Sequence, residues 1–110
     1  MLQPIPRYLL PHTARVRVPA DSELGGEHAA EPVEVWHVRF CPAEEVQGTD
    51  YVLTDGSKGL LFIDRVNSEG AFEVPADSLV EVLGSEMVAR KVTPCIERDG
   101  IVHHWEVELA

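Results

Sequence analysis

The alternation of residue types near the end of the chain constrains the fold more than any other feature of the sequence. One set of alternating positions comprises Ile101, His103, Trp105, Val107 and Leu109, and the positions between them are Val102, His104, Glu106 and Glu108. Successive side chains of a β-strand point to opposite faces. The pattern therefore predicts a strand with one face buried, and this strand anchors a sheet.

Short runs of β-branched and aromatic residues, bounded by turn residues, recur along the rest of the chain. We predict strands over residues 13–18, 33–41, 59–66, 79–83, 86–93 and 101–109, the last three forming a meander. Neither face of the 33–41 segment is uniformly apolar, so this strand is either covered on both sides or bulged. A short strand over 51–53 and one helical turn near 75–79 are the weaker candidates.

The fold class predicted from these strands is mostly β, with little helix. Six short strands in 110 residues indicate one domain, built as a sandwich or a small barrel. We favour a small SH3-like β-barrel because full closure removes exposed strand edges. Two polar stretches, residues 20–32 and 42–57, are expected to form long hairpin loops, and loops of such length are usually functional or disordered.

The first twelve residues form a proline-rich arm, MLQPIPRYLLPH. Its apolar side chains are Leu2, Ile5, Leu9 and Leu10, too many for a free tail. They pack either on their own domain or on a neighbouring subunit, and the sequence favours neither. The arm contains no apolar run long enough for a signal peptide or a membrane span, so we expect a soluble protein without a membrane partner.

The charge balance argues against sequence-specific DNA binding. Nine Lys and Arg residues stand against nineteen Asp and Glu residues, a formal net charge of −10. Phosphate backbones are bound through clustered Lys and Arg, and this chain has no such cluster. An acidic surface repels nucleic acid, so DNA is expected only as a non-specific passenger.

The cysteines and histidines do not form a recognisable catalytic or metal-binding motif. Cys41 and Cys95 lack C-x-x-C spacing and are expected to be buried free thiols. His103 and His104 should point to opposite faces of a strand, and His37 and Cys41 would lie about 13 Å apart along one. Cys95 with His103 would lack an activating helix N-terminus. We therefore predict no enzyme activity, no cofactor and no metal.

Four segments, in the same order along nearly the whole chain, resemble the phage minor capsid protein family. They are PIPRYLLPHT at the start, VWHVRF in the first long strand, LLFIDRVNS in the central apolar strand, and ARKVTPCIERDGIVHHWEVEL at the end. One departure lies at residues 75–77, where Pro-Ala-Asp replaces the Gly-Asp frequent in that family.

The resemblance implies a non-catalytic virion component of the head-completion or stopper type. Such a protein is expected to form a ring at the virion neck, after assembly in the host cytoplasm, and to contact itself, an adaptor and a tail terminator. The arm would supply partner contacts. The 42–57 loop would reach into the channel and help to retain packaged DNA, through Glu44, Glu45, Gln47, Asp50, Tyr51 and Asp55.

Several alternatives stay open at this point. A tail terminator or a capsid decoration protein would share the β-rich architecture, whereas an adaptor would be mainly helical. A protein of another class, a small enzymatic or metal-binding barrel using Cys41, Cys95 and the histidines, would be distinguished by metal analysis. A host regulatory or toxin-blocking protein that mimics nucleic acid through its acidic surface is the third alternative.

Overall fold

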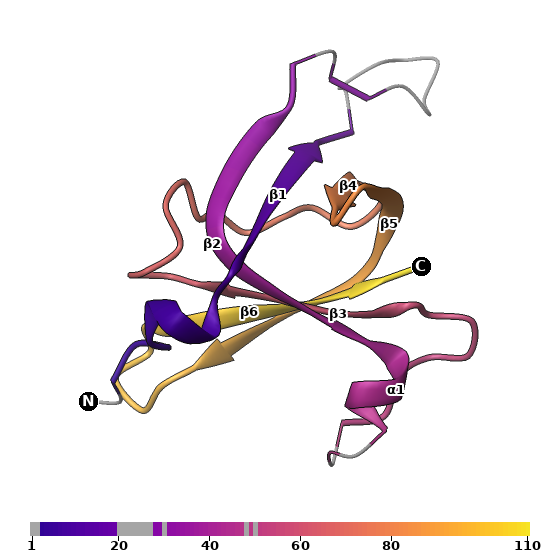
Figure 1. Cartoon of the computed structure of the whole chain (residues 1–110). Coiled ribbons are helices and arrows are strands. Elements are labelled where there is room, and N and C mark those ends of the chain that lie inside the picture. The colour runs from indigo at the N-terminus through magenta and orange to yellow at the C-terminus, as the bar shows by residue number, and fades with distance from the viewer. Residues whose placement is uncertain (1–2, 20–27, 30, 48, 50) are drawn as a thin grey trace.

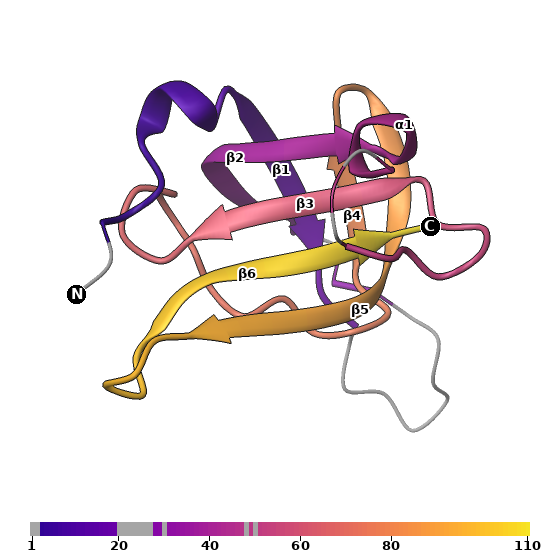
Figure 2. The same cartoon turned by 90° about the horizontal axis from the view of Figure 1, so that it is seen from below.

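The chain folds into a closed, six-stranded antiparallel β-barrel (Figures 1 and 2). The computed structural model describes residues 3–19, 28–29, 31–47, 49 and 51–110. Its strands are β1 (His12–Arg17), β2 (Val33–Pro42), β3 (Gly59–Asp64), β4 (Leu79–Val82), β5 (Ser85–Ile96) and β6 (Val102–Leu109). Their order around the barrel is β1-β2-β3-β6-β5-β4, closed by the pairing of β1 with β4. The predicted mostly β barrel is confirmed.

The barrel interior holds one apolar cluster to which every strand contributes. The alternation in the last strand is confirmed from Trp105 onward, because Trp105, Val107 and Leu109 point inward and are at most 8% exposed. Further members include Ala14, Val16, Val35, Val38, Leu61, Ile63, Val80, Val82, Met87 and Ala89. Burying one such aliphatic side chain contributes roughly 2 kcal/mol, so this cluster is the main source of stability.

Strand β2 is bulged, which is one of the two arrangements that its mixed faces predicted. Val35 and Val38 are both fully buried although they are three positions apart, which a regular strand does not allow. His12 pairs with Val38 while Thr13 pairs with Trp36, so His37 is the extra residue. His37 has a φ of 57°, in the left-handed region typical of such irregularities. The bulge returns Val38 to the interior.

The meander of the last three strands is confirmed, and its long central strand turns the corner of the barrel. β5 pairs with β4 through its first residues and with β6 through the remainder. Ala89 pairs with Leu109 while Lys91 pairs with Glu108, so Arg90 is an extra residue on β5. A bulge of this kind sharpens the local twist and lets one strand serve both sides of the barrel.

Helix is limited in the described part of the chain to two short elements, η1 (Arg7–Leu9) and α1 (Ala43–Val46). Neither has the length or apolar character needed to cross a membrane. The predicted helical turn near 75–79 is wrong: Ser78 closes a turn onto the Pro75 carbonyl, and Asp77 has a φ of 72°, which a right-handed helix excludes.

Two further predictions concern the loops. The short strand expected over residues 51–53 is wrong, because these residues adopt no regular structure. The 20–32 connection joins two paired antiparallel strands, β1 and β2, as expected of a hairpin. Most of that connection lies outside the described residues.

Candidate functional site

The N-terminal arm folds back onto the barrel (Figure 2). Leu10 is fully buried in its own domain, Ile5 is half-buried and Leu9 is 39% exposed. Leu2, also predicted to contact a partner, lies outside the described residues. The arm therefore packs on its own domain through Leu10 and presents Leu9 at the surface.

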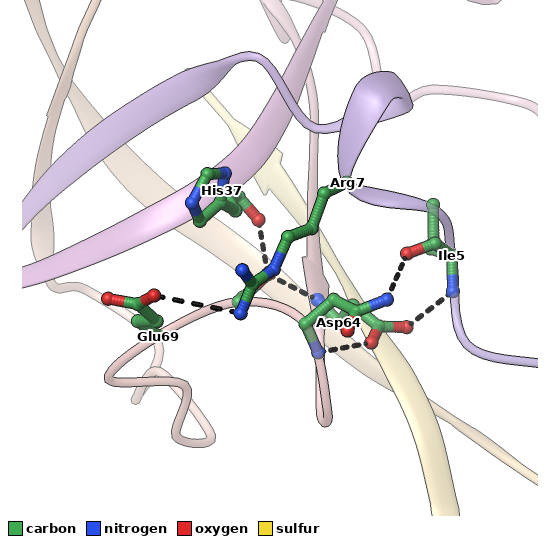
Figure 3. Close-up of polar contacts among 7 residues, drawn as sticks. Ile5, Arg7, His37, Asp64 and Glu69 are labelled. Carbon is green, nitrogen blue, oxygen red and sulfur yellow. Dashed lines mark hydrogen bonds and ion pairs between the residues drawn. The ribbon is translucent and has the colours of Figure 1, made fainter.

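The buried carboxylate of Asp64 holds the arm in place (Figure 3). One oxygen of Asp64 accepts a hydrogen bond of 3.0 Å from the backbone N–H of Ile5. Its other oxygen accepts bonds from the N–H groups of Val66 and Asn67, at 3.0 and 2.8 Å. The Asn67 amide then donates to the Ile5 carbonyl at 2.8 Å. Both backbone groups of Ile5 are thus bonded to the turn after β3.

Hydrogen bonds of Ser68 fix this turn to the bulge of β2. The Ser68 hydroxyl donates to the His37 carbonyl and accepts the backbone N–H of Asp64 at 2.9 Å. Arg7 of the arm and Glu69, which follows Ser68, form an ion pair of 3.6 Å (Figure 3). Both side chains of that pair are more than half exposed, so it contributes little to stability. The buried bonds of Asp64 and Ser68 determine where the arm lies.

A second buried carboxylate, Glu108 on β6, holds the 42–57 loop. Glu108 is fully buried and accepts hydrogen bonds from the Tyr51 hydroxyl at 3.0 Å, the Thr54 N–H at 2.6 Å and the Ser57 hydroxyl at 2.8 Å. Burial by itself raises the pKa of Glu108, but the bonds from Ser57, Thr54 and Tyr51 outweigh it and lower the pKa below its usual value. The ionised carboxylate therefore organises the loop.

Tyr51, one of the predicted channel residues, points toward the barrel instead of toward solvent. Burial, followed by the hydrogen bond to Glu108 and the charges of Glu108 and Glu106, raises the pKa of Tyr51 to about 12. The phenol therefore remains a donor at neutral pH. Its part in the described structure is to hold the loop down.

The other predicted channel residues are mostly exposed. α1 begins the loop and buries only Val46, whereas Glu44, Glu45, Gln47 and Asp55 face solvent. Asp50 lies outside the described residues. Arg90 donates a hydrogen bond of 2.8 Å to the backbone carbonyl of Asp55 and not to its side-chain carboxylate. The loop thus presents acidic side chains from a backbone that is held in place.

A surface groove crosses β2 and β3 between the arm and the loop. At the arm end it is apolar and is lined by Ile5, Leu9, Leu10 and Phe62; at the loop end it is lined by Val46, Thr49, Tyr51 and Leu60. Arg39, Cys41 and Phe62 line both ends. Arg39 contacts the Cys41 sulfur at 3.3 Å and Glu45 at 3.9 Å.

The cysteines are free and half-buried, but the predicted arrangement of the histidines is wrong. The Nδ1 atoms of His103 and His104 are 2.8 Å apart. Cys95 pairs with His104 while Ile96 pairs with Val102, so His103 is an extra residue on β6. This bulge removes the regular alternation and brings the two rings together.

The chemistry of Cys95 does not favour nucleophilic catalysis. Burial, followed by the charge of Glu106 and a hydrogen bond to it, raises the pKa of Cys95 to about 11. The thiolate is the reactive form of cysteine, so a raised pKa suppresses its nucleophilicity near neutral pH.

Comparison with protein families matches residues 6–109 to the family described as minor capsid protein. The chain belongs to the minor capsid protein family. The match spans all six strands, both carboxylate anchors and most of the arm, and it confirms the resemblance seen in the sequence. No curated protein and no solved structure matches the chain significantly. Family membership identifies the chain as a structural capsid protein of a phage, located in the virion.

The two residues that organise this minor capsid protein's surface were not singled out from the sequence. Asp64 lies in the LLFIDRVNS segment, three residues before Asn67 and four before Ser68. Such a cluster of Asp, Asn and Ser is typical of a turn in which a side chain accepts hydrogen bonds from the following backbone N–H groups. Glu108 lies on the polar face of the last strand, where a glutamate is ordinarily solvated. Its partners come from a loop more than fifty residues earlier, so no local signal marks it.

Proposed function

We propose that this minor capsid protein is a head-completion (stopper) component of the virion neck. It forms a ring with copies of itself beneath the portal and adaptor, retains packaged DNA and provides the surface to which the tail is joined. The observation that carries this proposal is the placement of the arm and the loop at opposite ends of one strand pair.

β3 and β6 are antiparallel, with Leu60 opposite Glu108 and Asp64 opposite His104. The two anchoring carboxylates therefore lie at opposite ends of this pair, about 13 Å apart along the strands. Figure 2 shows the arm at one end of β3 and α1 at the other. A cyclic ring needs two different surfaces on each subunit, because each surface contacts the other kind on its neighbour. The arm and the loop supply two such surfaces.

The acidic loop supports a channel-facing position. Glu44, Glu45 and Asp55 are exposed on a backbone that Glu108 and Arg90 hold in place. Negative side chains along a channel repel the phosphate backbone, which lets DNA pass without sticking. A fixed loop of this kind, repeated around a ring, narrows the passage and obstructs the return of DNA.

Deletion of the gene from the phage, with electron microscopy of the lysate, tests the proposal. A neck component predicts DNA-filled heads that leak, or empty heads beside unattached tails, and rescue by the wild-type gene supplied in trans. Normally joined particles would contradict a neck role and favour capsid decoration. Tails of irregular length on sealed heads would favour a tail terminator instead.

The arm's contribution can be tested without disturbing the core. Leu9→Asp places a charge on an exposed arm residue, whereas Val88→Asp does so at a similarly exposed apolar residue of β5, outside the arm and the turn that holds it. We expect both variants to fold, and only Leu9→Asp to fail in rescuing head-to-tail joining. Equal rescue by the two variants would remove the arm from the proposed interface.

A further inference from the structure

Three side chains with metal-ligand chemistry converge on the outer face of β5 and β6. Cys95 is paired with His104 across the two strands, and Glu106 follows His104 by two residues, on the same face. The sulfur, one imidazole nitrogen and one carboxylate oxygen all lie within 4.8 Å of one another. All three residues are half-buried. The cluster is thus sheltered but open to an ion from solvent.

The hydrogen bonds behind His104 determine which of its nitrogens faces the cluster. The Gln3 carbonyl can only accept, so His103 donates to it from Nε2, at 2.6 Å. A neutral His103 then accepts at Nδ1, and His104 donates to it from its own Nδ1 at 2.8 Å.

This relay leaves a lone pair on Nε2 of neutral His104, which lies 3.2 Å from a Glu106 oxygen. Two lone pairs facing each other at this distance repel unless a cation lies between them, either a proton that makes His104 a donor to Glu106 or a metal ion that takes the place of that proton. An imidazole whose second nitrogen is held by an outer hydrogen bond is the usual form of a metal-ligating histidine.

We propose that Cys95, His104 and Glu106 bind a divalent transition-metal ion of the zinc type, with the fourth position open to water. Thiolate, imidazole and carboxylate are all zinc ligands. Ligand atoms bound at 2.0–2.3 Å in a tetrahedron lie about 3.3 to 3.8 Å apart. The separation of 3.2 Å between His104 and Glu106 is close to that edge length, and the Cys95 sulfur lies within 4.8 Å of both atoms.

Binding of the metal ion changes the protonation of Cys95. The Cys95 thiol, which now donates to Glu106, releases its proton to solvent as the sulfur binds the ion. The ion links β5 to β6 beside the His103 contact with the arm. A structural ion of this kind stabilises a fold without catalysing a reaction, so it is compatible with the proposed neck function, and metal analysis alone does not separate that function from the metal-binding alternative named above. It revises the sequence-based prediction that the chain binds no metal.

The test uses the full-length chain without a histidine tag, stripped of metal with a chelator and then dialysed. Cobalt(II) is titrated into it, the thiolate-to-metal absorption band is recorded, and zinc is added in competition. We expect one ion per chain, and a rise in melting temperature with zinc. Cys95→Ser should abolish the thiolate band. His104→Ala should weaken binding by more than the roughly tenfold to hundredfold that loss of an outer-shell partner costs.

Cys41→Ser is the matched control, because Cys41 is the other half-buried free thiol and lies on β2, outside the cluster. It should bind the ion as the wild type does. Circular dichroism of each stripped variant establishes that it is folded. Absence of metal binding by the wild-type chain, or a thiolate band that survives in Cys95→Ser and disappears in Cys41→Ser, would overturn the proposal.

Discussion

The carboxylate of Glu108 accepts a 2.6 Å hydrogen bond from the backbone N–H of Thr54, fifty-four positions earlier in the chain. Asp64 makes an equivalent bond to the Ile5 N–H at the other end of the same strand pair. A buried charge is costly unless it is fully hydrogen-bonded. In the described part of the chain, no buried side-chain nitrogen or oxygen lacks a partner. Each acid is therefore stable only while its loop or arm stays in place.

Replacing Glu108 by Gln should loosen the 42–57 loop. The amide removes the charge, and with its oxygen at Thr54 and Ser57 its NH2 group replaces the oxygen that accepts from the Tyr51 hydroxyl, so we expect a loss of about 2 kcal/mol in the free energy of unfolding. Tyr51→Phe removes a single donor and should cost about 1 kcal/mol. Urea unfolding measures both, with the exposed Glu81→Gln as control. Unchanged stability in both loop variants would refute the anchoring role.

The contribution of Glu108 should depend on pH in a defined direction. The pKa of Glu108 is lowered in the folded chain from its ordinary value of 4.5. The unfolded state then binds the proton more tightly, so the stabilisation is complete above pH 4.5 and is lost as the pH falls through the folded-state pKa. The stability difference between wild type and Glu108→Gln should therefore be smaller at about pH 3 than at neutral pH.

Asp64→Asn should free the arm. It weakens three backbone bonds at a fully buried position, and we expect a loss of about 2 kcal/mol together with faster hydrogen exchange at the Ile5 N–H. Asn67→Ala removes only the second bond to the arm, so it should speed exchange at neighbouring arm residues with a smaller loss of stability. An arm that remains protected in both variants would contradict the model of a carboxylate-held arm.

Gly59→Ala should be among the most damaging single-methyl substitutions in the chain. A Cβ at this position would lie 2.4 Å from the Cys41 carbonyl oxygen and 2.6 Å from the Phe40 ring, too close without a shift of the strand backbone. We expect a loss of about 3 kcal/mol, measured by urea unfolding. Gly84→Ala meets open space, and its positive φ of 77° should cost only about 1 kcal/mol. Equal losses would contradict the close approach at Gly59.

Cys95 should react slowly with thiol reagents in the metal-free folded protein. A pKa raised from 9.0 to about 11 lowers the thiolate fraction at pH 8 about a hundredfold. In a Cys41→Ser background, the rate of disulfide exchange with a chromogenic reagent should rise steeply on unfolding in urea. A native rate equal to the unfolded rate would show that neither burial nor Glu106 suppresses the thiolate of Cys95.

The strands could be predicted because their signal is local. The alternation from Ile101 to Leu109 and the turn residues between runs define β6 and its neighbours, and the mixed faces of residues 33–41 left a bulge as one of two alternatives for β2. The prediction of a helical turn near Asp77 failed because this residue has a left-handed backbone conformation, which the sequence pattern of 75–79 does not reveal.

The site could be predicted only in part, because its key bonds join distant segments. Tyr51 was selected as a loop residue, but its contact with Glu108 depends on the closure of β3 onto β6. The meeting of His103 with His104 depends on a bulge opposite Cys95, which no pattern within the last strand reveals.

The central claim is that this minor capsid protein occupies the neck as a ring. The most direct measurement is a cryo-electron microscopy reconstruction of the virion neck, into which the barrel is fitted. We expect a ring of barrels between the adaptor and the tail, with the 42–57 loops facing the channel and the arms in contact with neighbouring proteins. Barrels found on the capsid faces or along the tail, and absent from the neck, would contradict this account.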